Sequence, residues 1–172
     1  MDLDRFRTAQ AEAAEGYESA LKEMRTTGKR SHWIWYVFPQ LEGLGRSANS
    51  KFYALTDLAE ATAYMKDPLL GARLLEIGST VTERLRQGAS LQVLMNSSVD
   101  VQKFVSSMTL FKGLAESAAK SGHDESLHRL SQVATEILLA ANAEGFPPCR
   151  TTLDRLKISS RPKGYALSTA RV

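Results

Sequence analysis

Residues 67–88 read DPLLGARLLEIGSTVTERLRQG and carry the clearest helix signal in the chain. Asp67 suits the capping position of a helix N-terminus, and Pro68 suits the first turn, where no backbone N–H is needed. Gly88 follows at the point where a helix is expected to stop. The apolar positions recur every three or four residues: Leu70, Leu74, Ile77, Val81 and Leu85. This spacing predicts a helix with one buried face.

The same spacing predicts two more long helices downstream. One is expected to begin near Ser98 or Asp100, and the other at Asp124, with Gly145 after its last residue. The predicted buried stripes are Val101, Phe104, Val105, Met108, Phe111, Ala115 and Ala118 in the first helix, and Leu127, Leu130, Ala134, Ile137, Leu138 and Ala141 in the second. Shorter helices are expected at Leu3–Ala9, at Glu12–Arg25, after Thr56 or Asp57, and at Thr151–Lys157. We therefore predict an all-α domain of roughly six to eight helices.

Composition places the chain among ordinary globular proteins. It has 172 residues, of which 43% are hydrophobic and 24% charged, and the length favours one domain. No apolar run approaches the ~20 residues that a bilayer requires, and the acidic N-terminus does not resemble a secretory signal, so no membrane association is expected. A single cysteine cannot form an internal disulfide, which suggests a cytoplasmic location.

The positive charge is concentrated at the C-terminal end. The formal net charge is +3, but residues 150–172 contain six basic residues and one acidic residue, so the rest of the chain is slightly acidic. We expect a helical domain over residues 1–157 and a basic C-terminal tail over residues 158–172. Nucleic-acid binding is then at most a weak contact through the tail, because the body offers no basic surface.

The aromatic segment Ser31–Phe38 could be a strand or a helix. Its aromatic and β-branched residues favour a strand, but no second run of similar quality is present to pair with it. We predict a helix that starts from Ser31 as its cap and ends at Phe38, because the residue before Pro39 avoids the helical region.

Three stretches resemble one protein family. Residues 28–47 read GKRSHWIWYVFPQLEGLGRS, residues 53–74 contain Tyr53-Ala54-Leu55 and Asp67-Pro68-Leu69-Leu70-Gly71, and residues 106–111 read SSMTLF after Asp100 and Lys103. These motifs resemble those of the bacterial and fungal family known as domain of unknown function 1810, and the resemblance covers roughly Asp2 to Leu156. The chain departs from the family pattern at Met95–Val99, and its tail lies outside the family.

The resemblance implies a compact, mainly helical domain without an agreed activity. Some family members are labelled calpastatin-like, but calpain-inhibitory segments are disordered peptides, whereas this chain has the periodicity of a packed helical domain. The family therefore supports the predicted fold and leaves the function open.

Polar residues near the two tryptophans are the first candidates for a binding site. Lys29, His32, Gln40, Ser47 and Thr109 are predicted to surround one partly open pocket, with the indole of Trp33 or Trp35 as a wall. Such polar groups form either a fully bonded structural network or a site for a polar, planar ligand, since an unpaired buried polar group costs about 1–3 kcal/mol. His32 could also act as an acid or base, although the sequence identifies no partner carboxylate.

Glycines and basic residues extend this candidate site. Gly43 and Gly45 lack the spacing of a phosphate loop, but their backbone N–H groups could hold an anion together with Arg46 and Ser47. Arg73 and Lys103 are expected to join them. No metal site is predicted, because His123 and His128 are five residues apart, and no cofactor is implied. Cys149 is not expected to be reactive, because no helix start or histidine was identified beside it.

Three classes of function remain open. The first is a small-ligand-binding domain, either a binding protein or an enzyme, for a polar planar or anionic molecule such as a nucleotide. The second is a protein-interaction module that uses an exposed tryptophan and the basic tail. The third is weak nucleic-acid binding through the tail. The mixture of polar and aromatic residues favours a pocket, and no reaction type or oligomeric state follows from the sequence.

Overall fold

The computed structural model describes residues 2–120 and 124–160, which form ten helices and no strand beyond one isolated bridge between Leu41 and Leu55. The helices are α1 (Asp4–Ala11), α2 (Tyr17–Arg25), α3 (Ile34–Val37), α4 (Ala48–Phe52), α5 (Leu58–Lys66), α6 (Leu70–Arg86), α7 (Leu91–Met95), α8 (Ser98–Ala119), α9 (Glu125–Ala143) and α10 (Arg150–Ser160). The all-α prediction is confirmed. The expected six to eight helices were too few, because α4 and α7 are too short to show a periodic stripe.

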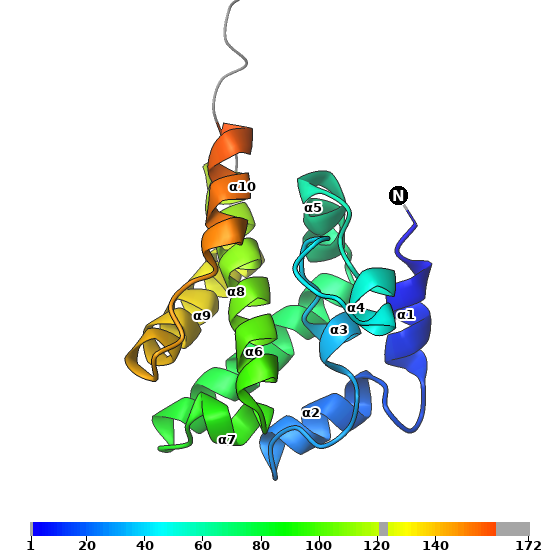
Figure 1. Ribbon diagram of the computed structural model, residues 1–172, viewed down its shortest axis with the longest axis vertical. Helices are drawn as coiled ribbons and strands as arrows, with labels where there is room; N and C mark the ends of the chain where they lie inside the picture. The colour runs from blue at the N-terminus through cyan, green and yellow to red at the C-terminus, as the bar shows by residue number, and fades with distance from the viewer. Residues whose placement is uncertain (1, 121–123, 161–172) are drawn as a thin grey trace, which may run out of the picture.

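Helix α8 is the central element of the fold. It packs along α9 and α10 on one side, and it also contacts α3, α5 and α7. Figure 1 shows α8, α9 and α10 together on one side of the molecule, with α1, α3, α4 and α5 on the other. Helix α6 joins these two groups, since it packs against α2, α5 and α9.

Short polar side chains fix the starts of the long helices, largely as the sequence predicts. The Asp67 carboxylate accepts hydrogen bonds from the backbone N–H groups of Leu69 and Leu70, at 3.1 and 2.9 Å. Asp124 caps α9, Asp57 caps α5, and Ser97, one residue before the predicted start, caps α8. These oxygens satisfy N–H groups that a helix cannot bond internally.

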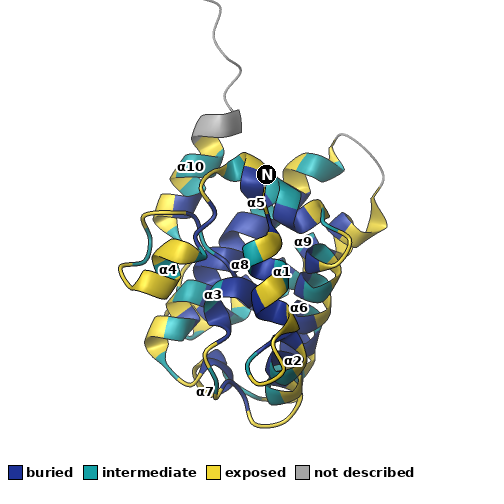
Figure 2. Cartoon of the chain, turned by 90° about the vertical axis from the view of Figure 1, so that its right-hand side faces the viewer, coloured by how far each residue is buried: buried dark blue, intermediate teal, exposed yellow. Residues whose placement is uncertain are grey.

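The predicted apolar stripes form one continuous core. Every predicted buried residue of α9, and all those of α6 and α8 except Leu85 and Ala118, are buried in the structure. Figure 2 shows the buried faces turned inward across the bundle, with exposed residues on the outer faces and loops. Phe38 and Phe104 link the aromatic segment to α8, with ring centroids 4.6 Å apart.

Two helix starts differ from the prediction. Helix α2 begins at Tyr17 rather than near Glu12, because residues 12–16 form a turn closed by a 2.9 Å hydrogen bond from Gly16 N–H to the Glu12 carbonyl. Helix α3 begins at Ile34 rather than after Ser31. The Ser31 hydroxyl does not cap this helix, because it donates to the Glu23 carboxylate at 2.6 Å.

At the C-terminal end, α10 extends the predicted Thr151–Lys157 helix to Ser160. The predicted tail lies outside the described residues from position 161 onward. Among the helices that the structure describes, none has the length and apolar character needed to cross a membrane.

Candidate functional site

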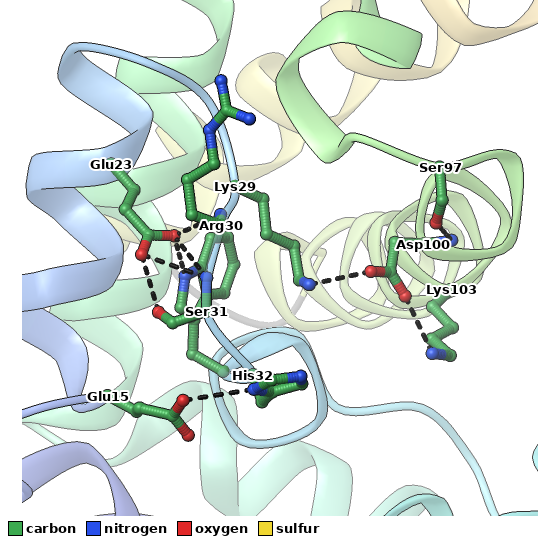
Figure 3. A network of polar contacts seen from close by, with 10 residues as sticks. Glu15, Glu23, Lys29, Arg30, Ser31, His32, Ser97, Asp100 and Lys103 are labelled. Carbon is green, nitrogen blue, oxygen red and sulfur yellow. Dashed lines mark hydrogen bonds and ion pairs between the residues drawn. The ribbon is translucent and has the colours of Figure 1, made fainter.

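A dense hydrogen-bond network holds the start of the aromatic segment against α2. The Glu23 carboxylate accepts from the backbone N–H groups of Arg30 and Ser31, from the Ser31 hydroxyl, and from the Trp33 indole N–H at 2.7 Å. Figure 3 shows the donors of Arg30 and Ser31 converging on the one carboxylate. Burial acts to raise the pKa of Glu23, but these hydrogen bonds outweigh it and hold the pKa below its ordinary value. The arrangement is that of a satisfied structural network.

A second network joins the same segment to α8. The Asp100 carboxylate lies 2.8 Å from the ammonium nitrogens of both Lys29 and Lys103 (Figure 3). Burial acts to raise the pKa of Asp100, but the hydrogen bonds and charges of the two lysines lower it overall. Two ammonium groups share one carboxylate, so this cluster carries one positive charge in excess. Lys29 is only 8% exposed, whereas Lys103 extends over the Trp35 ring, 4.8 Å from its centroid.

Beside Lys103 lies a cleft of about 410 Å³, here called the Gly-loop cleft. One wall is the loop and first turn of α4, and the other is α8. Its lining residues are Gln40, Leu44, Gly45, Arg46, Ser47, Ser50, Val99, Gln102, Lys103, Ser106 and Cys149. Four predicted site residues, Gln40, Gly45, Ser47 and Lys103, therefore meet here, although they come from segments about sixty residues apart.

The loop is held in shape by its glycines and by backbone contacts. Gly43 has a φ of +85°, which side-chain-bearing residues rarely adopt, and a Cβ on Gly45 would come within 2.3 Å of the Ser50 Cβ. The Ser47 hydroxyl accepts from Ser50 N–H and caps α4. Arg155 of α10 donates to the Glu42 carbonyl at 2.8 Å. The predicted loop is therefore an ordered wall of the cleft.

Ser106 and Cys149 bring the start of α10 close to the cleft. Ser106 is 3% exposed, and its hydroxyl lies 3.3 Å from that of the buried Thr152. Burial acts to raise the pKa of the Cys149 thiol, but the Thr152 and Ser106 hydroxyls and the N–H groups of Thr152 and Thr151 lower it overall. The expectation that no helix start acts on Cys149 is wrong, because α10 begins at the next residue.

The structure does not bring the five predicted pocket residues together. Gln40 and Ser47 line the Gly-loop cleft, but Lys29 is buried against Asp100. His32 is exposed and lies 3.1 Å from Glu15, the partner that the sequence did not reveal. Thr109 lines an apolar hollow with Leu138, Pro148 and Leu153, accepts from Cys149 N–H and donates to the Val105 carbonyl. The prediction of one pocket is therefore wrong.

Four further candidates also lie outside the cleft lining. Trp33 is fully buried, and Trp35 is partly covered, so neither offers the exposed indole expected of an interaction module. Arg73 stacks over the Tyr17 ring at 4.7 Å and reaches the Gln10 side chain. Gly43 shapes the loop without lining the cleft. Packing and backbone geometry explain Trp33, Arg73 and Gly43, whereas the buried indole N–H of Trp35 has no hydrogen-bond partner among the described residues.

Sequence reasoning missed several lining residues. Ser50, Gln102 and Cys149 were not among the predicted site residues, although the structure places all of them around the cleft. Arg46 was considered as an anion-binding residue and Ser106 as a possible pocket residue, and both also line the cleft. A usable signal was present for Cys149, because a helix was predicted from Thr151 and a residue just before a helix start meets free N–H groups. His123, considered for a metal site, lies outside the described residues.

Comparison with known proteins supports the resemblance seen in the motifs. A protein family described as "Protein of unknown function (DUF1810)" matches residues 1–137. A crystal structure of the conserved hypothetical protein Rv1873 from Mycobacterium tuberculosis is similar, with 34% sequence identity and a TM-score of 0.66. The similarity covers 89% of this chain and 94% of that chain. A comparison with curated proteins finds no match. By the extent of the family match and the similarity to this structure, the chain belongs to the DUF1810 family.

Proposed function

We propose that this protein binds a small anionic molecule in the Gly-loop cleft. The observation that carries the proposal is the charge of the lining. Its two ionised side chains are the cations Arg46 and Lys103, and its lining residues include no carboxylate. The neutral polar groups around them are amides, hydroxyls and one thiol, most of which can donate hydrogen bonds to an anion.

Both cations have charge available for a ligand. Arg46 is exposed and forms no ion pair among the described residues, so its guanidinium can form charge-assisted hydrogen bonds. Lys103 contacts Asp100, but that carboxylate is shared with Lys29. The positive charge in excess at this cluster favours an anion in the adjoining cleft.

The size and lining of the cleft restrict the ligand. About 410 Å³ lies within the range of ordinary small-molecule sites. A phosphate or carboxylate group near Arg46 and Lys103 suits the donors, and Leu44 and Val99 can contact a short apolar portion. No aromatic ring is among the lining residues. We therefore propose an anionic ligand, as the sequence suggested, but we no longer expect the ligand to be planar.

A titration with inorganic pyrophosphate tests this proposal. Backbone NMR at constant ionic strength should show chemical-shift changes in residues 40–50, in the first turns of α8 and at Cys149. Arg46→Ala should weaken binding about tenfold, since a charge-assisted contact is lost. Arg30→Ala is the matched control, because Arg30 is also exposed and lies outside the cleft lining.

Three results would contradict the proposal. One is equal pyrophosphate affinity in wild type and Arg46→Ala. Another is the absence of shifts around the cleft with millimolar pyrophosphate and with citrate as a carboxylate probe. A general electrostatic effect would instead weaken binding equally in Arg46→Ala and Arg30→Ala, and this outcome also overturns the proposed site.

A further inference from the structure

A second cleft of about 710 Å³ lies on the other side of α4. Residues of the segment 47–53 alternate between the two clefts: Ser47 and Ser50 line the Gly-loop cleft, whereas Asn49, Phe52 and Tyr53 line the second. We call the second one the aromatic cleft. Its remaining walls come from α1, from the α1–α2 connection and from the segment containing His32 and Tyr36.

Three aromatic rings line this cleft, and the middle ring, that of Tyr53, contacts the other two. Tyr36 and Tyr53 have ring centroids 5.1 Å apart at an interplanar angle of 62°, and Tyr53 and Phe52 are 4.8 Å apart at 85°. The rings are thus set steeply to one another rather than stacked. Phe52 is 60% exposed, so its ring is accessible to a ligand.

Two carboxylates accompany the rings. The Glu12 side chain is exposed and forms no ion pair among the described residues, and Glu15 contacts His32. Burial raises the pKa of Tyr53, and the negative charge of Glu12 raises it further. Burial likewise raises the pKa of Tyr36, with contributions from Glu15 and Glu12. Both carboxylates therefore act electrostatically on the tyrosines of the cleft.

The one permanent cation of this lining is already neutralised. Arg5 lies 2.7 Å from the Glu60 carboxylate and donates to the carbonyls of Asp2 and Ala54. Its guanidinium also covers the Phe6 ring, 4.3 Å from the centroid. The charge left for a ligand is consequently that of Glu12 and Glu15, in contrast to the Gly-loop cleft.

We propose that the aromatic cleft binds a small organic cation that carries an alkylated ammonium group. Aromatic faces attract such a cation through their quadrupoles and contact its methyl groups, and nearby carboxylates add a charge attraction. An alkylated ammonium group is also weakly hydrated compared with a metal ion or a free ammonium group, so a partly apolar cleft suits it. This site is separate from the anion site, and neither proposal depends on the other.

A paired titration with choline and 3,3-dimethylbutan-1-ol tests the charge requirement. These probes have nearly the same shape, but only choline is positively charged. We expect choline to shift backbone NMR signals in residues 8–15 and 49–53 at millimolar concentration, and the alcohol to bind much more weakly. Absence of choline binding, or equal binding of the two probes, would overturn the proposal.

Two substitutions test the contributions of the Glu12 carboxylate and the Phe52 ring to choline binding separately. Glu12→Gln should weaken choline binding about two- to fivefold, which is the range expected for the loss of a solvent-exposed ion pair. Glu18→Gln is the control, because Glu18 is exposed and lies outside the cleft lining. Phe52→Ala should weaken it to a similar extent through the lost cation–π contact. Circular dichroism checks that each variant is folded. Unchanged choline affinity in both Glu12→Gln and Phe52→Ala would exclude this cleft as the site.

Discussion

The two clefts on either side of α4 differ in charge although they share one short helix. The Gly-loop cleft has Arg46 and Lys103 and no lining carboxylate, whereas the aromatic cleft has Glu12 and Glu15 and three rings. The difference arises from the segments around α4: the preceding loop supplies Arg46 and α8 supplies Lys103 on one side, and the α1–α2 connection supplies Glu12 and Glu15 on the other. The ligands that we propose for the two clefts are therefore opposite in charge.

The carboxylates of the two polar networks, Glu23 and Asp100, are among the lining residues of neither cleft. Glu23 accepts hydrogen bonds from several donors, and Asp100 is paired with two lysines, so both carboxylates already take part in structural contacts. Arg46 and Glu12 form no ion pair among the described residues. Position on a cleft wall, with Arg46 and Glu12 as the charges there that lack an ion pair within the described part of the chain, therefore separates binding candidates from structural residues.

The largest expected effect is on the scaffold that both clefts share. Phe38 is fully buried, contacts Phe104 and Trp33, and lies between Tyr36 of the aromatic cleft and Gln40 of the Gly-loop cleft. Phe38→Ala should lower the free energy of unfolding by about 3–5 kcal/mol, because it leaves a large cavity. Urea denaturation measures this, with Phe38→Leu as a milder control. A loss below about 1 kcal/mol would show that the two clefts do not share this support.

The next largest effect should distinguish Glu23, a carboxylate of the structural network, from Glu12, a carboxylate of the aromatic cleft. Glu23→Ala removes the acceptor of the Trp33 indole N–H and of the Ser31 hydroxyl, so we expect a loss of about 2–3 kcal/mol in denaturant unfolding. Glu12→Ala removes a carboxylate without an ion pair and should change stability by less than about 0.5 kcal/mol. Equal losses in the two variants would contradict the division between structural and available carboxylates.

Lowering the pH should reduce the contribution of Glu23 and Asp100 to the free energy of unfolding. The pKa values of Glu23 and Asp100 are below their ordinary values in the folded state, so the unfolded chain takes up protons first as the pH falls. Their contribution is complete above the unfolded pKa values of about 4 and is lost as the pH falls through the lower folded values. Glu23→Gln should flatten this acid loss in pH-dependent urea unfolding, whereas Glu18→Gln should leave its slope unchanged.

The fold was largely predictable because its long helices carry local signals. The stripes of α6, α8 and α9, and caps such as Asp67 and Asp124, depend on residues within a few positions of one another. The start of α2 was missed because Ala13 continues the helical spacing, although the chain turns between Glu12 and Gly16. Alanine carries little burial energy, so its position is a weak signal.

The candidate site was only partly predictable because its members meet through tertiary contacts. Gln40, Gly45 and Ser47 were identified as one loop, and Lys103 through the family motif, but nothing local connects this loop to Cys149. His32 and Lys29 adjoin the same aromatic segment, yet their side chains contact Glu15 and Asp100. Sequence neighbours alternate in direction around tight turns, so closeness in sequence could not predict a shared cavity.

A smaller effect concerns the independence of the two clefts. Arg46→Ala should change choline affinity by less than about twofold, and Glu12→Gln should do the same for pyrophosphate, because separate sites without shared partners are nearly additive. The NMR titrations described above measure both cross-effects. A large change in either affinity would indicate that α4 transmits a change from one cleft to the other. The two clefts would then form one coupled site.

The smallest effect on stability should come from Phe52, in contrast to the large effect expected for Phe38. Phe52 is 60% exposed, and its ring contacts Tyr53 at the rim of the aromatic cleft. Most of its surface already contacts water, so Phe52→Ala should cost less than about 0.5 kcal/mol in urea unfolding, although Phe38→Ala removes the same number of atoms. A loss of about 2 kcal/mol or more would show that Phe52 supports the fold, and its exposure would then no longer favour a role in binding.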